Sequence, residues 1–415
     1  MLATWMEAVA PPRPPERLLE EAFARTMAAR QLPVYPWHRV RLGRARGGGA
    51  AGDRVRGLAL AGVAIALVAA LASGVLPQFG QGIVGQPSPT SPPSPSPSAA
   101  APPSPRASPV PSGAPFPSPI AVEPIAAIPI TGVIGLATDG ASIWLFTNTG
   151  DVARIDPVTN AIVATVRPNP ENPDYQGLAA SATGLWLTDW SANRLYRLDP
   201  QTLRTVATIV PAATSKGVIA TDAAVWIANT RGGSVERIDP ATNNVTAELP
   251  LGRIGPSGPN WLTRGFGSIW VGIPNASIVA RINERTNVTE STITVSSPAS
   301  PCGGMAATTT AIWITSCDGS NFLTQIDPVT NKVVGTIDLA NRGYGITVIG
   351  DRPWTAPNDG QIVRIDPASH AVDRVVSPGP AFKGGGDIVV GAGSVWVSDW
   401  SANRVLRLPL DAFGG

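Results

Sequence analysis

The chain has 415 residues, of which 43 are Gly, 43 are Pro and 14% are charged. Gly and Pro together make up about a fifth of the sequence, roughly twice their average usage, which argues against a predominantly helical protein. The formal net charge is +2. Its basic excess lies in residues 1–56, and the remaining residues are not basic enough to suggest a nucleic-acid partner. With two His and two Cys, the chain has too few ligands for a multi-ligand zinc site. It also has few residues from which a histidine-centred active site could be built.

Residues 57–76 form an uncharged apolar segment that ends before Pro77. As an α-helix it would span about 30 Å, the thickness of the hydrocarbon core. Six Arg and one Asp lie in residues 39–56, and no charged residue follows the segment until Arg106. The positive-inside rule therefore predicts a transmembrane helix in a bacterial-type plasma membrane, with a cytoplasmic N-terminus and an extracytoplasmic C-terminal part. The long region before the segment favours an uncleaved signal anchor over a cleaved signal peptide.

The segments on either side of this helix are not expected to be globular domains. Within residues 1–56, Leu19, Phe23 and Met27 recur at four-residue spacing and predict a short amphipathic helix. With the Arg cluster, this helix is expected to lie on the inner leaflet, and a docking helix for a cytoplasmic partner is the alternative. Residues 77–119 are rich in Pro and Ser, which predicts an extended linker without a core.

A repeat begins at about residue 120 and is the strongest signal in the chain. Each unit has four short β-rich segments, as in GVIATD, AVWIANT, SVERIDP and NVTAELPL of the third unit. The repeat is anchored by seven Trp residues, at positions Trp144, Trp186, Trp226, Trp270, Trp313, Trp354 and Trp396. A period of about 40–45 residues with four strands per unit is typical of a β-propeller blade. Residues 120–415 are therefore predicted to be an all-β, seven-bladed propeller, with one Trp per blade packed between blades.

The last unit is incomplete, because the chain stops after its third predicted strand. Residues 121–130 (AVEPIAAIPI) stand where a fourth strand would precede the first unit. We expect this N-terminal strand to complete the last blade and close the ring without an exposed inner edge.

A turn motif, Asp-Pro-x-Thr-Asn, joins the third and fourth strands of several units, as at Asp156–Asn160 and Asp327–Asn331. The pattern resembles a metal or sugar motif, but a structural interpretation is favoured. Asp accepts backbone N–H bonds, Pro presets φ, and Asn tolerates the left-handed region.

The units LWLTDWSANRLYRLDP and VWVSDWSANRVLRLP resemble the repeats of the virginiamycin B lyase (streptogramin lyase) group and of wider YVTN-type propellers. This resemblance implies the seven-bladed fold. For the lyase it also implies His and Glu residues near Mg²⁺, with a His as the base. The predicted propeller has one His, His370, in the third-to-fourth-strand turn IDPASH, on the opposite face from the one that usually binds. The catalytic His therefore has no counterpart here, and no cofactor or metal is predicted.

The binding face of a propeller usually carries the second-to-third and fourth-to-first loops. From the two DWSANR copies we expect Asp189, Trp190, Asn193, Asp399, Trp400 and Asn403 on this face, with the two Trp flanking the first blade. The fourth-to-first loops are expected to add Tyr175, Lys216, Arg253, Trp261, Arg342, Tyr344, Phe382 and Lys383. Exposed aromatic residues with scattered cations suit a carbohydrate, peptide or protein ligand. The alternative is that DWSANR is a consensus turn whose Trp folds over a neighbouring blade.

Two further features concern Arg264 and the two Cys. Arg264 occupies an inner-strand position that is Ala or Val in other blades, and it is either an anion ligand or a charge in a wet channel. Cys302 and Cys317 fall at the same end of one predicted hairpin, and in an extracytoplasmic domain they are expected to form a disulfide.

Three function classes remain. The scattered acidic residues favour a non-catalytic, membrane-anchored, extracytoplasmic binding or scaffold module. The alternatives are a lyase-like or lactonase-like metal-dependent enzyme, and a transmembrane sensor that couples the propeller to a cytoplasmic partner through residues 1–56.

Overall fold

The computed structural model describes residues 116–252, 258–317, 321–339, 343–357, 359–384 and 386–414. The expected cytoplasmic segment, the transmembrane helix at 57–76 and nearly all of the linker lie outside these residues. Within the described ranges, no helix is long and apolar enough to cross a membrane. At the end of the predicted linker, Phe116 packs against the apolar core of the propeller, so the folded unit begins slightly before residue 120.

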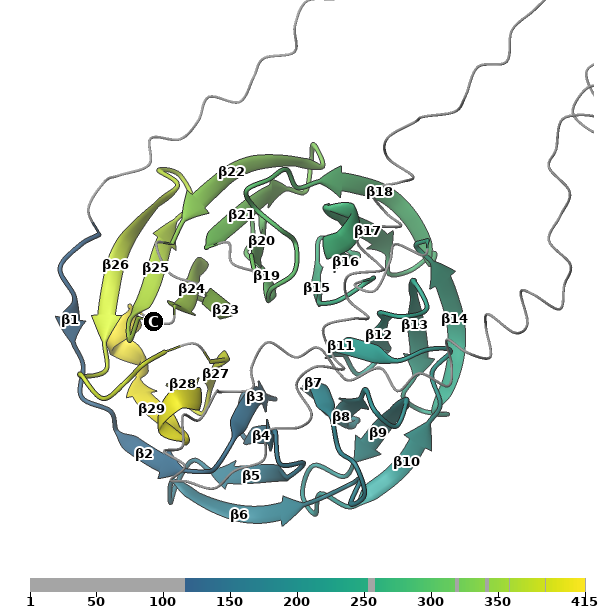
Figure 1. Cartoon of the computed structure of the whole chain (residues 1–415), viewed down its shortest axis with the longest axis horizontal. Helices are drawn as coiled ribbons and strands as arrows, with labels where there is room; N and C mark the ends of the chain where they lie inside the picture. The colour runs from purple at the N-terminus through teal and green to yellow at the C-terminus, as the bar shows by residue number, and fades with distance from the viewer. Residues whose placement is uncertain are drawn as a thin grey trace, which may run out of the picture. The chain divides into compact units, whose positions relative to one another are not determined.

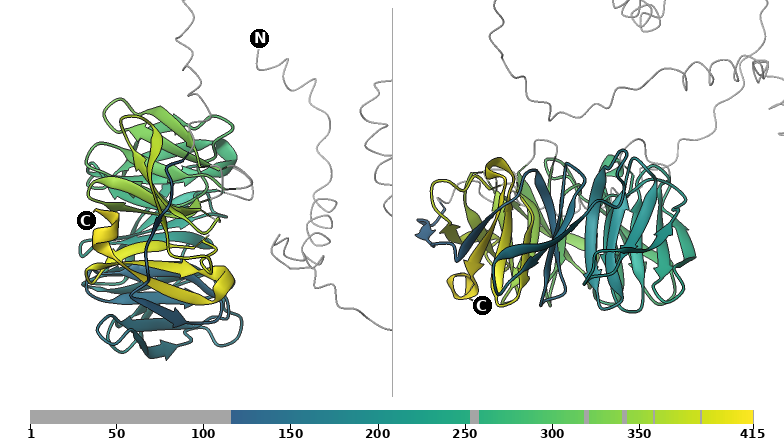
Figure 2. Two further views of the ribbon diagram at one scale, coloured as in Figure 1. Left: turned by 90° about the vertical axis from the view of Figure 1, so that its left-hand side faces the viewer. Right: turned by 90° about the horizontal axis from the view of Figure 1, so that it is seen from below.

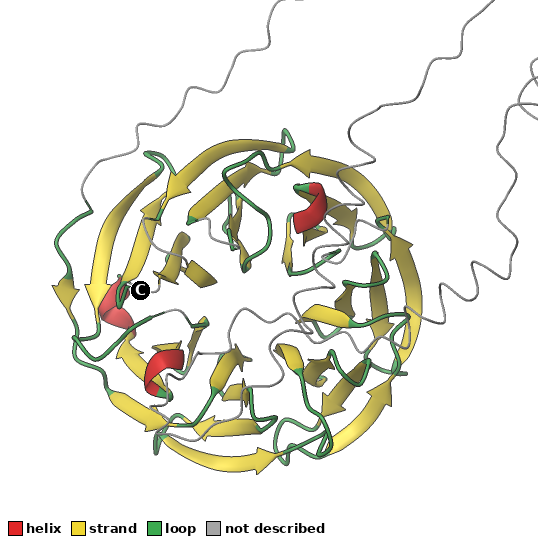
Figure 3. Ribbon diagram, in the orientation of Figure 1, coloured by secondary structure: helices red, strands yellow, loops and turns green. Residues whose placement is uncertain are grey.

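Seven antiparallel sheets stand around one axis and form a closed ring, which confirms the predicted seven-bladed propeller (Figure 1). Figure 3 shows that strands make up almost all of its regular structure. In chain order, the strands of blades 1 to 3 are β3 (Val133–Thr138), β4 (Ile143–Thr147), β5 (Val152–Asp156), β6 (Ala161–Val166); β7 (Tyr175–Ser181), β8 (Gly184–Asp189), β9 (Arg194–Leu198), β10 (Thr205–Ile209); β11 (Ser215–Ala220), β12 (Val225–Asn229), β13 (Ser234–Asp239) and β14 (Asn244–Pro250).

Blades 4 to 7 repeat this order, with the first strand of each blade nearest the axis (Figure 1). Their strands are β15 (Leu262–Gly265), β16 (Ser268–Ile273), β17 (Ile278–Asn283), β18 (Val288–Thr294); β19 (Met305–Ala307), β20 (Ile312–Thr315), β21 (Phe322–Asp327), β22 (Lys332–Asp338); β23 (Gly343–Ile349), β24 (Arg352–Pro357), β25 (Ile362–Asp366), β26 (Ala371–Ser377); β27 (Ile388–Gly391), β28 (Ser394–Asp399) and β29 (Arg404–Pro409). Three short 3-10 helices are described: η1 (Pro274–Ala276), η2 (Trp400–Ala402) and η3 (Leu410–Phe413).

The N-terminal segment closes the ring, as the sequence predicts. Strand β2 (Ala126–Pro129) pairs antiparallel with β29 and becomes the fourth strand of blade 7. The sequence does not predict a second pairing, in which β1 (Ile120–Ala121) adds a fifth, parallel strand to the outer edge of β26 in blade 6. The same short segment therefore joins two neighbouring blades.

The apolar core consists of seven clusters, one between each pair of neighbouring blades. The repeated Trp residues, all at most 2% exposed, lie in these clusters, which confirms their predicted role in packing between blades. Because each blade buries its two faces against two neighbours, no blade has a core of its own.

An arginine of the third strand links each of several blades to the next blade. We call this contact the arginine latch. In blade 4, Arg281 lies beside Trp270 in the strand register, and its guanidinium stacks 4.9 Å from the indole centre. Its Nη1 donates to the Pro328 carbonyl at 2.6 Å and to Asn331 Oδ1 at 3.0 Å, both in the third-to-fourth turn of blade 5. Arg197 and Arg407 make the same pair of bonds to the next blade.

The Asp-Pro-x-Thr-Asn turn is therefore structural, as predicted, and it also receives the latch. Hydrogen bonds from Val158 N–H and the Thr159 hydroxyl lower the pKa of Asp156 below its ordinary value. Asn160 takes φ 56°, which leaves its side chain placed to accept from Arg407. One motif thus forms the turn and fixes the neighbouring blade.

At the junction of blades 1 and 2, Arg154 bonds Gln201 in place of a Pro carbonyl and an Asn. At two further junctions, no third-strand arginine among the described residues reaches a turn of the next blade. Between blades 5 and 6, Gln325 stands where other blades carry Arg, and His370 takes the left-handed Asn position with φ 53°. Blade 7 has no third-to-fourth turn, because its fourth strand comes from the N-terminus. There the buried Phe413 of η3 packs edge-on against Trp354, with ring centres 4.8 Å apart.

The predicted disulfide is present. Cys302 and Cys317 are bonded across the start of β19 and the end of β20, with their Cα atoms 5.5 Å apart.

We expect Arg281→Ala to lower the free energy of unfolding more than Arg237→Ala. Arg281 makes hydrogen bonds to its own blade and to blade 5, whereas Arg237 makes a single described hydrogen bond, to Asn287. The expected loss for Arg281→Ala is about 2–3 kcal/mol. Urea unfolding of both variants tests this, and equal losses would show that the latch bonds add no stability beyond stacking on Trp.

Replacing both Cys residues with Ser should lower the free energy of unfolding by about 3 kcal/mol, because the bridge closes a short loop in the unfolded chain. Denaturant unfolding with and without reductant measures this. Reductant should destabilise the wild type and leave the double Ser variant unchanged; a wild type insensitive to reductant contradicts the prediction.

Candidate functional site

The ring has two faces, which Figure 2 shows edge-on in two orientations. One carries the second-to-third and fourth-to-first connections and is called the loop face. The other carries the first-to-second and third-to-fourth turns and is called the turn face. The sequence places most candidate ligand residues on the loop face.

The Asp and Asn residues of the two DWSANR copies hold their own turns. Asp189 is buried and accepts hydrogen bonds from Asn169 and Ser191. Asp399 is buried and pairs with Arg404 at 3.0 Å. Asn193 and Asn403 take φ 51° and 52°, and each bonds the backbone of an adjacent loop. For these four residues the structure agrees with the consensus-turn interpretation.

Trp190 is half-buried and lies between two cationic groups of blade 3. The Arg231 guanidinium lies 4.9 Å from its ring centre and the Lys216 ammonium 5.6 Å from it. Arg231 is exposed and forms no ion pair among the described residues. Trp190 therefore folds toward blade 3, and the expectation that it flanks blade 1 is wrong.

Trp400, also half-buried, folds toward blade 1. Its Nε1 donates to the Ile134 carbonyl at 2.9 Å, and its ring lies 5.3 Å from that of Tyr344 in blade 6. Trp261 is half-buried where β15 begins. The loop face thus presents Trp190, Trp261, Tyr344 and Trp400 from four blades, with cations beside the first.

The inner strands of five blades carry Gly two residues before the residue that pairs with the repeated Trp, at positions Gly135, Gly177, Gly217, Gly304 and Gly345. A Cβ on Gly217 would lie 2.4 Å from the Asn260 carbonyl oxygen, so glycine lets neighbouring inner strands approach. Blade 7 has Asp387 at this position. Its carboxylate accepts from the Leu136 N–H of blade 1 at 3.1 Å and from the Ile388 N–H at 3.0 Å. Burial raises the pKa of Asp387 to about 6 despite these two bonds. Asp387 is not among the residues predicted from the sequence, although its departure from the glycine pattern is visible there.

The other expected residues fall in different settings. Tyr175 is buried, and burial raises the pKa of its hydroxyl, which accepts from Asn169 N–H. Phe382 is also buried, in the core between blades 6 and 7, so its expected place on the surface is wrong. Lys383 is exposed and bonds the Pro380 carbonyl. Arg253 and Arg342 lie outside the described residues.

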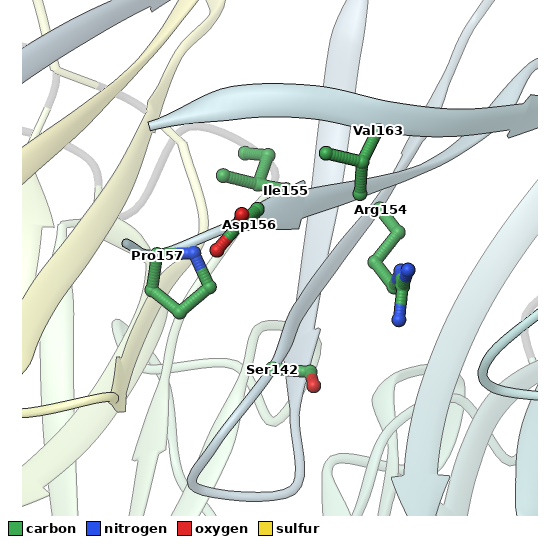
Figure 4. A pocket seen from close by; sticks show the side chains of 6 residues that line it. All are labelled: Ser142, Arg154, Ile155, Asp156, Pro157 and Val163. Atoms are coloured by element: carbon green, nitrogen blue, oxygen red, sulfur yellow. The ribbon is translucent and has the colours of Figure 1, made fainter. Parts of the chain in front are cut away.

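Arg264 projects on the turn face, away from the other candidates. Its Nε and Nη2 pair with both carboxylate oxygens of Glu284, at 2.5 and 2.9 Å. Both residues line a shallow pocket of about 200 Å³ between blades 3 and 4. A similar pocket of about 170 Å³ on blade 1 holds Arg154 and Asp156 on opposite sides (Figure 4). His370 lies in a turn of this face, as expected.

Among the described residues, no group of three or more His, Cys, Asp or Glu is placed to hold a metal ion. No family model and no curated protein matches the chain. Among solved structures, the chain is similar to a streptogramin B lyase at 18% identity and a TM-score of 0.58, over 68% of this chain and 94% of that chain. At this low identity, the likeness shows the seven-bladed fold alone.

We expect the stability difference between the wild type and Asp387→Gly to depend on pH. An unfolded Asp titrates near pH 3.9, and the folded value is about 6. Between these pH values the folded state binds a proton that the unfolded state has released. The contribution of Asp387 to stability is therefore present at low pH and falls as pH rises through about 6.

Asp387→Gly introduces the residue that five other blades carry at this position. The substitution removes the Asp387 carboxyl group and leaves the other titrating residues in place. The melting temperature of the wild type relative to Asp387→Gly should fall from about pH 4 to pH 6.5 and then stay level. Thermal unfolding by circular dichroism measures both proteins. Parallel curves across this range would contradict a raised pKa at Asp387.

Proposed function

We propose that the protein is a membrane-anchored, extracytoplasmic propeller that binds a carbohydrate, peptide or protein ligand through its loop face. The observation that carries the proposal is Trp190, half-buried between Lys216 and Arg231. Trp, Tyr and Arg are enriched among the residues that contribute most to binding at protein interfaces. Tyr344 and Trp400 form a second aromatic pair on the loop face, across the ring from Trp190.

Anchoring and orientation rest on the sequence before residue 116. The apolar segment at 57–76 and the Arg residues before it support a single span with the propeller outside the cytoplasm. The Pro-rich linker would hold the propeller away from the membrane. On this proposal, residues 1–56 lie against the inner leaflet or contact a cytoplasmic partner, and the second case would make the protein a sensor.

A lyase-like or lactonase-like activity rests on the shared fold alone. The same fold carries many unrelated functions, so site residues must supply the argument. The loop face offers aromatic and cationic groups, which suit binding.

The full chain in detergent micelles should bind at least one member of an array of oligosaccharides and peptides. Trp190→Ala should weaken this binding roughly tenfold or more, because the indole provides both stacking surface and the support for Arg231. Fluorescence titration with the array member identified first gives the affinities.

Phe266→Ala is the matched control, because Phe266 is 39% exposed in a turn of the opposite face. It should leave the affinity unchanged. Binding that survives Trp190→Ala and Trp400→Ala but is lost in Phe266→Ala would place the ligand on the turn face and overturn the proposal.

A further inference from the structure

Blade 4 departs from the repeat at two positions that touch. Its third-to-fourth turn reads Asn283-Glu284-Arg285-Thr286-Asn287, in place of Asp-Pro-x-Thr-Asn. Its inner strand carries Arg264, opposite Ile269, where the same register position is Ala180 in blade 2 and Ala307 in blade 5. The Arg264 guanidinium meets the Glu284 carboxylate through two bonds. The fold does not require either residue, since the other blades form without them. Departures of this kind are expected at functional sites.

These residues give the pocket between blades 3 and 4 an unusual charge. Its lining contains the side chains of Arg237, Arg264 and Arg285 and one carboxylate, Glu284. Three positive groups and one negative group leave a net charge of +2. The lining of the pocket on blade 1, which lies within a single blade, holds one Arg and one Asp, with no net charge (Figure 4).

Arg237 occupies the latch position of blade 3. Most of its side-chain N–H groups have no described hydrogen-bond acceptor. Its guanidinium stacks 5.5 Å from the Trp226 ring centre and donates one hydrogen bond, to Asn287 Oδ1 at 3.2 Å. In contrast, Arg281 donates to four acceptors. In the altered turn of blade 4, Glu284 stands in place of Pro, and Arg237 has no described hydrogen bond to the carbonyl at this position. The remaining N–H groups of Arg237 are available to a ligand in the pocket.

The other two arginines approach from different elements. Arg264 comes from β15 and is held in place by Glu284, with 55% of its side chain exposed. Arg285 is exposed in the turn between β17 and β18. Three guanidinium groups from three elements can donate to different oxygens of one tetrahedral anion, and guanidinium groups bind phosphate through paired N–H donors.

We propose that this pocket binds a phosphate group, as inorganic phosphate or a small phosphate monoester. A phosphate monoester carries about −1.5 to −2 charge at pH 7, which matches the pocket's net charge. A carboxylate carries a single charge on two oxygens, whereas a phosphate monoester carries a larger charge on three, so we expect the carboxylate to bind more weakly. The site lies on the turn face and is independent of the ligand proposed for the loop face.

The test is calorimetric titration of the full chain in detergent micelles with inorganic phosphate, glycerol phosphate and acetate. Phosphate and glycerol phosphate should bind, and acetate should bind at least tenfold more weakly. Arg285→Gln should weaken phosphate binding about tenfold, because it removes one charge-assisted contact from an exposed residue without a structural side-chain role. Arg204→Gln, an exposed arginine beside the blade 2 turn, is the matched control and should not alter the affinity.

Arg264→Gln should also weaken binding, and its unfolding curve shows whether the fold is kept when Glu284 loses its partner. Selective binding of glycerol phosphate would identify a monoester as the ligand, and equal binding would identify the phosphate group itself. The proposal is overturned if phosphate does not bind at about 10 mM, if acetate binds as well, or if Arg285→Gln binds phosphate like the wild type.

Discussion

The ring is held together by contacts that pass from one blade to the next, and the arginine latch is the most specific of them. A Trp of the second strand supports an Arg of the third, and that Arg reaches the turn of the following blade. Apolar clusters lie between neighbouring blades, but the hydrophobic effect is not directional and does not fix register. The latch does, because its acceptors are a single carbonyl and a single Asn side chain. Each turn can receive it only when neighbouring blades stand at the correct angle and height.

Much of this architecture is readable from the sequence because it repeats. The Trp spacing predicts seven blades, the unpaired ends predict closure by the N-terminal strand, and the position of the two Cys predicts the disulfide. Contacts between side chains of neighbouring blades cannot be predicted from the repeat in this way. The direction in which Trp190 folds and the pairing of Arg264 with Glu284 depend on how adjacent sheets are inclined. Phe382 is buried for the same reason, since a neighbouring blade covers it.

Departures from the repeat carry more functional information than the repeat itself. From the sequence, residues such as Asp189 and Asn403 are predicted to contact a ligand. In the structure they stabilise turns that recur between blades. Asp387 and Arg264 occupy positions where other blades have small residues, and each changes the charge of its surroundings. The two departures lie on opposite faces. The loop face combines aromatic and cationic side chains, and the turn face carries one pocket lined by three arginines.

The position of the N-terminal strands has a mechanical consequence. A force that reaches the propeller along the preceding chain first meets β1, which lies parallel to β26, and then β2, which is paired with β29. The hydrogen bonds between paired strands run across the strands. A pull along the strands therefore loads these bonds together, whereas peeling the strands apart loads them one at a time. With two consecutive attachments on adjacent sheets, detaching β1 would leave the closed ring intact. The outermost strand can thus yield to tension before the seal between first and last blades is disturbed.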